Sequence, residues 1–173
     1  MAMQLTHYGQ DILRKKTKRV SEIDGSILQL IEDMFETMYH EDGIGLAANQ
    51  VGVDLAIATI DISHMEEDVD PFVIINPEIV DKDGTEVMEE GCLSIPGVRE
   101  EVKRAEHVTV EYMDRDGKKV QREAEGLLAR VIQHETDHLN GKFYVDRISP
   151  LKRRFLQNKL NSIARRGFQA EEE

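Results

Sequence analysis

The sequence has one cysteine, no tryptophan and no long apolar run. A lone cysteine cannot form an internal disulfide, so cysteine usage favours a reducing compartment such as the cytoplasm. No apolar stretch approaches the roughly 18 residues that a membrane span requires. The first residues also lack the charged segment and apolar core of a signal peptide. We therefore expect a cytoplasmic protein with no membrane partner.

Positive charge is also scarce. The 22 lysines and arginines face 34 aspartates and glutamates, which gives a formal net charge of −12. This balance argues against an anionic membrane surface, and direct DNA binding is not expected. A length of 173 residues with 40% hydrophobic and 32% charged residues is typical of one globular domain. We expect residues 1–173 to form that single domain.

The hydrophobic pattern predicts an α+β fold. Helices are expected at 26–40 and 126–139, where apolar residues recur at helical spacing. Residues 1–23 are expected to be mostly extended. Strands are indicated by alternating or β-branched residues at 55–61, 72–75, 98–103, 107–114 and 118–123, with a short strand between turns at 76–77 and 83–84.

The C-terminal stretch differs from the rest of the chain. Six basic residues and no acidic one lie between Pro150 and Gln169, together with apolar residues at helical spacing. We predict a basic amphipathic helix over 150–168. Its apolar stripe can pack on the domain while the charges are solvated, or the helix can dock on an anionic partner such as a ribonucleoprotein surface.

A short motif at the C-terminal half of the second predicted helix indicates a metal site. His134 and His138 stand four residues apart, so on a helix both imidazoles can face one ion. Glu135 lies beside them, where it can take a proton from a metal-bound water. The motif is short, and the alternative is a helix that happens to carry these polar residues.

A catalytic metal commonly has three protein ligands and an open position for water. No histidine follows His138, so the third ligand is expected upstream, and Cys92 is the strongest candidate. The remaining candidates are histidines in segments without other site-like features: His7, His40, His64 and His107. One thiolate and two imidazoles suit Zn²⁺ and can also hold Fe²⁺, Ni²⁺ or Co²⁺.

A glycine-rich stretch spans residues 43–52. Three glycines among small apolar residues indicate backbone that turns sharply or approaches another group closely. The glycine spacing matches neither a phosphate loop nor a dinucleotide fingerprint. Gln50, near its end, is either a binding side chain or a solvated loop residue.

Three segments together resemble the signature motifs of the peptide deformylases: residues 43–50, 90–94 and 133–139. They occur in the family's order and at similar separations, and the 90–94 motif and the tail are similar to bacterial type 1 members. The resemblance implies hydrolysis of the formyl group from the N-terminal formyl-methionine of newly made polypeptides, with release of formate. We expect antiparallel or mixed strands around a central helix carrying His134, plus an N-terminal and a C-terminal helix.

The resemblance also implies a role for individual residues. The implied metal ligands are Cys92, His134 and His138, with Fe²⁺ the usual physiological ion and Zn²⁺ or Ni²⁺ common substitutes. Glu135 would act as general base and then as proton donor. The Gln50 amide and the Leu93 backbone N–H would hold the formyl oxygen, and Gly45 would help to position the substrate backbone.

Helical geometry places the pocket for the methionine side chain. Leu127 and Val131 share a helix face with His134, and with Ile44 and Met88 they can form an apolar slot. Arg130, on the same face, departs from the apolar residues usual in the family. Its stem is expected to line the slot with its charge at the rim, which leaves the preferred side chain open.

Arg99 can receive a peptide carbonyl or carboxylate, although an exposed strand charge is the more common explanation for such a residue. Two other function classes compete with the deformylase interpretation. A metallo-endopeptidase is disfavoured because no ligand follows His138. A catalytically silent metal-binding or ribosome-docking module is disfavoured because it would need neither Glu135 nor Gln50.

Overall fold

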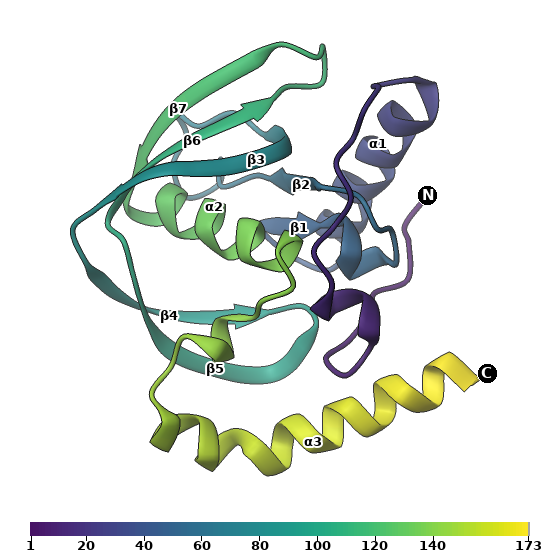
Figure 1. The fold of residues 1–173 in the computed structure, drawn as a ribbon, viewed down its shortest axis with the longest axis vertical. Coiled ribbons are helices and arrows are strands. Elements are labelled where there is room, and N and C mark those ends of the chain that lie inside the picture. The colour runs from purple at the N-terminus through teal and green to yellow at the C-terminus, as the bar shows by residue number, and fades with distance from the viewer. Residues whose placement is uncertain (173) are drawn as a thin grey trace.

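The computed structural model describes the backbone of residues 1–172 and the side chains of residues 1–166. Helix α2, Gly126–Leu139, lies at its centre between two β-sheets (Figure 1). Nearly all side chains from Leu128 to Leu139 are buried. The helix ends at Leu139, and the chain turns at Gly141, whose φ of 76° is left-handed and where an added Cβ would lie 2.5 Å from the carbonyl oxygen of Arg14. Only glycine fits this stop.

The larger sheet has five antiparallel strands in the order β1-β2-β3-β6-β7. Their bounds are β1 Gly45–Ala47, β2 Ile57–Ile60, β3 Phe72–Asp83, β6 His107–Met113 and β7 Lys119–Glu125. The main apolar core lies between this sheet and α2 and includes Ile60, Ile74 and Ile132. The sheet therefore covers one side of the helix that carries both motif histidines.

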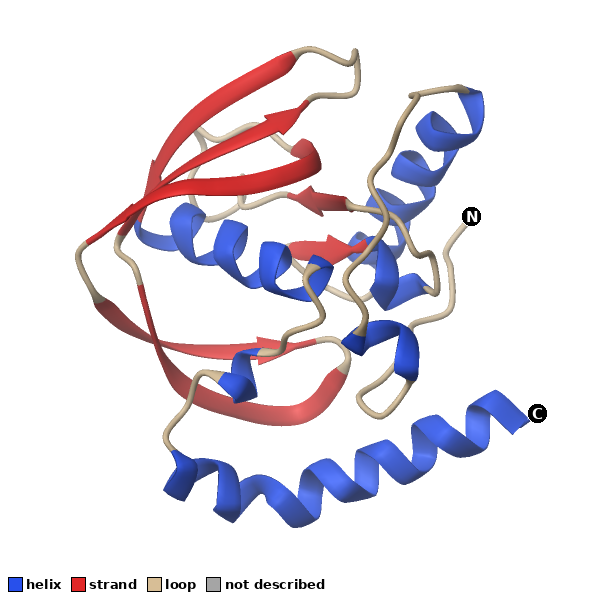
Figure 2. Ribbon diagram, viewed as in Figure 1, coloured by secondary structure: helices blue, strands red, loops and turns tan. Residues whose placement is uncertain are grey.

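The smaller sheet is a hairpin of β4, Glu86–Cys92, and β5, Ile95–Arg104. It covers the opposite side of α2, as the ribbon coloured by secondary structure shows (Figure 2). Helix α1, Gly25–His40, packs four apolar side chains against β1 and β2. The Asp24 carboxylate caps it by accepting a hydrogen bond from the Ile27 N–H at 3.0 Å.

Helix α3, Pro150–Glu172, runs along the outside of the β4–β5 hairpin. Leu160 and Ile163 are buried in a third apolar cluster with Phe143 and Tyr144. At the start of the helix, however, Leu151 and Phe155 are 62% and 79% exposed. The predicted stripe is therefore exposed at Leu151 and Phe155 and packs at Leu156, Leu160 and Ile163. No helix within residues 1–172 is long and apolar enough to cross a membrane.

The main elements match the α+β prediction, and three short helical turns complete the fold: Asp11–Arg14, Ala48–Val51 and Tyr144–Asp146. The first of these lies in the segment that was expected to be extended. The expected break at 76–77 is wrong, because β3 continues through it. Asn76 adopts a φ of 52° at an irregularity in the strand, and its side chain pairs with both backbone polar groups of Val20.

Two strands were not predicted. β1 was interpreted as part of a glycine-rich loop, and β4 was hidden by its charged residues and by its glycine. Cys92 is the last residue of β4. β1 is hydrogen-bonded to β2, and β4 is hydrogen-bonded to β5 across the hairpin. Local composition does not reveal such pairing partners.

Candidate active site and metal centre

Three donor atoms converge between α2 and the β4–β5 hairpin. They belong to Cys92, at the end of β4, and to His134 and His138, and all lie within 4.8 Å of one another. The two histidine Nε2 atoms are 3.1 Å apart, and Cys92 Sγ is 3.2 Å from Nε2 of His138. Within residues 1–172, none of the other histidine candidates joins a group of this kind.

The donor set fits a divalent metal ion. A thiolate and two imidazoles are the soft and borderline ligands that such ions take in proteins. His138 is fully buried, so its ring is held in place by the surrounding core. One carboxylate oxygen of the adjacent Glu135, Oε2, is buried without a hydrogen-bond partner. An ion with a water molecule beside this oxygen would satisfy it.

Glu90 holds the first histidine in place. The His134 Nδ1 lies 2.8 Å from Glu90 Oε1, so Nδ1–H donates to the carboxylate and Nε2 is left to face Cys92 and His138. Burial would raise the pKa of Glu90, but hydrogen bonds from His134 and Arg104 outweigh it and lower the pKa to about 2. Neither Glu90 nor Arg104 was assigned a role from the sequence.

Glu135 lies at the wall of the cavity beside the donor atoms. Its Oε1 is 3.9 Å from Nε2 of His134. Burial raises the pKa of Glu135 to about 7, against the opposing charges of His134 and Arg104. A carboxyl group with a pKa near neutrality can both accept and return a proton.

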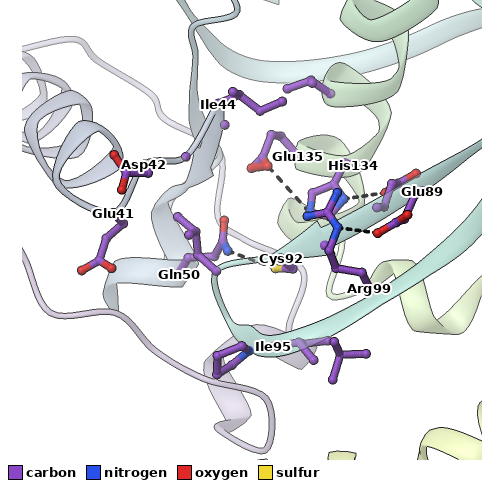
Figure 3. A pocket seen from close by; sticks show the side chains of 18 of the residues that line it. Glu41, Asp42, Ile44, Gln50, Glu89, Cys92, Ile95, Arg99, His134 and Glu135 are labelled. Carbon is purple, nitrogen blue, oxygen red and sulfur yellow. Dashed lines mark hydrogen bonds and ion pairs between the residues drawn. The ribbon is translucent and has the colours of Figure 1, made fainter.

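Gln50 is buried and oriented, so its interpretation as a solvated loop residue is wrong. Its Oε1 accepts a hydrogen bond from the Ala47 N–H at 3.0 Å, which fixes the amide. Its Nε2 therefore points to the cavity, 3.1 Å from Ser94 Oγ and 3.4 Å from Cys92 Sγ (Figure 3). Leu93 follows Cys92 in the hairpin turn and lines the same cavity.

A cavity of about 690 Å³ opens beside these groups. It is lined by Gln50, Cys92, His134 and Glu135. All the residues predicted to bind substrate also line it, namely Ile44, Gly45, Met88, Arg99, Leu127, Arg130 and Val131. The structure adds residues from other segments, including His7, Glu41, Asp42 and Met65. No local sequence signal identifies these, because distant loops bring them to the rim.

The expected position of the Arg130 charge is wrong. Arg130 is only 4% exposed, and its guanidinium pairs with Glu90 instead of lying at the rim. The buried Glu90 carboxylate replaces water as the partner of the Arg130 guanidinium, so the charge can be buried. Arg99, by contrast, is exposed at the edge of the cavity, where its Nε donates to Glu89 Oε1 at 2.7 Å (Figure 3).

Comparison with known proteins identifies the family of this chain. The polypeptide deformylase family model matches residues 2–154. A curated peptide deformylase from Thermodesulfovibrio yellowstonii is 47% identical over 160 residues, which cover 92% of this chain and 97% of that protein. A crystal structure of a peptide deformylase from Legionella pneumophila has a TM-score of 0.87, 46% identity and 98% coverage of both chains.

A second crystal structure, of the peptide deformylase from Synechococcus elongatus in complex with actinonin, has a TM-score of 0.83 and 45% identity. It covers 95% of this chain and 86% of that one. The family match spans most of the chain, and the curated relative agrees with it over nearly the same residues. This chain therefore belongs to the polypeptide deformylase family.

Proposed function

We propose that this chain hydrolyses the formamide of N-terminal formyl-methionine on newly made polypeptides, and that Glu135, Gln50 and the Leu93 backbone carry out the reaction beside a metal ion. Membership of the family makes the chain a metal-dependent hydrolase. One observation carries the assignment of roles. The Glu135 carboxyl group and the Gln50 amide line the same cavity as two of the three converging donor residues.

Each of these groups has a chemical task. A divalent ion held by Cys92, His134 and His138 supplies Lewis acidity and makes water acidic enough to react near neutral pH. Glu135 accepts the proton of the attacking water and then delivers one to the departing amine. The Gln50 Nε2–H and the Leu93 N–H donate to the formyl oxygen as it gains negative charge, and one such donor is commonly worth about 2.7–4 kcal/mol.

The lining of the cavity supports formyl-methionine as the substrate. Ile44, Met88, Leu127 and Val131 provide apolar surface for an unbranched side chain. Gly45, in the edge strand β1, lies where the substrate backbone would pass, and Arg99 stands at the outer edge. We infer that the pocket selects methionine and that the chain beyond it leaves along the charged rim.

Membership of the family supports Fe²⁺ as the physiological ion, and the thiolate and two imidazoles can also hold Zn²⁺, Ni²⁺ or Co²⁺ in purified protein. We also propose that the chain acts as a single domain in the cytoplasm, where nascent chains emerge. Docking on the ribosome through α3 would bring the enzyme to its substrate. The exposed basic residues of this helix support that proposal: Arg154, Lys159, Arg165 and Arg166. The net charge of −12 makes a direct DNA partner unexpected.

The decisive experiment measures formate release from a formyl-Met peptide by protein purified without oxygen and loaded with Fe²⁺. We expect turnover that a chelator stops. Glu135→Ala should abolish turnover while one equivalent of metal stays bound, because Glu135 moves a proton and is not a ligand. Absence of formate from the metal-loaded wild type, with other formyl peptides also tested, would leave a metal-binding module. Cleavage of internal peptide bonds would indicate an endopeptidase.

A further inference from the structure

Arg130 joins the two halves of the candidate metal centre. The donor atoms come from separate elements, since Cys92 ends β4 whereas both histidines lie on α2. Their mutual distances therefore depend on how the β4–β5 hairpin sits against the helix. The cavity of about 690 Å³ lies between the two elements, so apolar packing is missing where it would otherwise hold them together.

The Arg130 side chain bridges this interface by three hydrogen bonds from one guanidinium. Nη1 donates to Glu90 Oε2 at 2.5 Å and to the Val102 carbonyl oxygen at 2.9 Å. Nη2 donates to the Glu86 carbonyl oxygen at 2.8 Å. These acceptors belong to both strands of the hairpin, whereas Arg130 belongs to α2. A planar, buried guanidinium that donates to several acceptors restrains the hairpin relative to the helix in more than one direction.

The same contact reaches a predicted metal ligand. Glu90 Oε1 accepts from His134 Nδ1, and Arg104 donates to both carboxylate oxygens, at 2.6 and 3.0 Å. Arg104 lies on β5 and Glu90 on β4, so that pair holds the hairpin together, and Arg104 also reaches the helix by donating to Asp137 Oδ2 at 2.8 Å. Arg130 adds a direct tie from α2 to the Glu90 oxygen that does not contact His134, and it also donates to the backbone of both hairpin strands.

We propose that Arg130 is a positioning residue that sets the geometry of the metal centre, by fixing Glu90 and the β4–β5 hairpin against α2. The inference rests on the proposed metal site. Two effects of the guanidinium oppose each other. Its positive charge repels a cation, whereas its hydrogen bonds hold the ligands in place. Residues that orient metal ligands typically change metal affinity about 10- to 100-fold, and we infer that the positioning effect dominates here.

The test compares Zn²⁺ affinity in wild type, Arg130→Met and Arg130→Lys, by competition with a chromophoric chelator and without substrate. Arg130→Met should bind Zn²⁺ about 10- to 100-fold more weakly. The visible spectrum of its Co²⁺ form should also shift, because the His134 ring is no longer held in one orientation. Arg130→Lys keeps the charge but loses the fork, so we expect a smaller loss of affinity.

Arg147→Met is the matched control. Arg147 donates to Asp137 at 2.6 and 2.8 Å in the same buried network, but it makes no contact with Glu90 among the interactions of the described residues. This variant should lose stability in urea while keeping the wild-type Zn²⁺ affinity and Co²⁺ spectrum. If Arg147→Met lost as much Zn²⁺ affinity as Arg130→Met, the effect of Arg130 would be a general structural one and the proposal would fail.

Unchanged or tighter Zn²⁺ binding by Arg130→Met would overturn the proposal, because repulsion by the charge would then equal or exceed positioning. If Arg130→Met does not fold, Arg130→Lys carries the test, and wild-type affinity in that variant overturns the proposal. These measurements need no turnover. An enzyme that binds Zn²⁺ as expected but releases no formate would contradict the proposed function and leave this inference standing.

Discussion

At the scale of single residues, Gly45 leaves the room that the Glu135 carboxyl group occupies. A Cβ added to Gly45 would lie 2.9 Å from Glu135 Oε1 and 3.0 Å from its Cγ and Cδ. The carboxyl group is buried, so an added Cβ would shift it from its position beside the donor atoms. The absence of a side chain at position 45 therefore determines where the proposed base lies.

We expect Gly45→Ala to reduce kcat for a formyl-Met peptide by up to about 100-fold, because the displaced carboxyl group loses its alignment with the attacking water. Metal content should not change, since Gly45 supplies no ligand. Steady-state kinetics and metal analysis measure both. Gly25→Ala is the control, because an added Cβ there meets nothing within 4 Å. Wild-type kcat in Gly45→Ala would show that the base tolerates displacement.

At the scale of elements, the described part of α3 has both packed and exposed side chains. Leu160 and Ile163 belong to the apolar cluster under the hairpin, so deleting the helix would expose that cluster. The exposed basic side chains can be changed without this damage. The packing interpretation of the amphipathic tail is confirmed for Leu160 and Ile163, and docking on an anionic partner stays a prediction.

We expect the double variant Arg154→Glu with Arg165→Glu to lose affinity for ribosomes, most clearly at low salt, because ionic contacts with phosphates are released as salt rises. Turnover of free formyl-Met peptides should stay at the wild-type level, since neither residue lines the cavity. Cosedimentation across a salt series measures the first effect. Lys118→Glu with Lys119→Glu makes the same charge change at the β6–β7 end, and equal losses in both variants would contradict specific docking through α3.

At the scale of the whole molecule, buried ion pairs join elements that are distant in the sequence. Glu90, Arg104, Asp137 and Arg147 form a continuous network from the hairpin through α2 to the segment before α3. Bonds from His134 and Arg104 overcome burial and keep the pKa of Glu90 at about 2, below its ordinary 4.5. A carboxyl group with a lowered folded-state pKa stabilises the fold above its unfolded-state pKa.

We therefore expect the free energy of unfolding to fall as the pH drops from about 4.5 towards 2, where Glu90 becomes protonated in the folded state. Urea denaturation across this range measures the loss. Glu90→Gln should be less stable near neutral pH but should show a shallower pH dependence, because it cannot titrate. Glu125→Gln, at an exposed glutamate, is the control. An equally steep dependence in Glu90→Gln would assign the acid sensitivity to other groups, such as Asp137.

The local pattern was sufficient for the elements whose stability comes mainly from one apolar face. Helix α1 begins at Gly25 and ends at His40, close to the predicted 26–40, and α2 covers the predicted 126–139. The four-residue spacing of His134 and His138 likewise placed two donor atoms on one helix face. These features depend on helical periodicity, which neighbouring residues fully specify.

Contacts between distant segments required the folded chain. The sequence alone left several candidates for the third donor, and only packing of the hairpin against α2 brought Cys92 to the two histidines. Likewise, the guanidinium of Arg130 is buried in an ion pair with the Glu90 carboxylate and does not lie at the predicted position at the rim. Helical periodicity depends on residues close together in the sequence. A buried charge, in contrast, is stabilised only by a partner that the tertiary structure brings into contact with it.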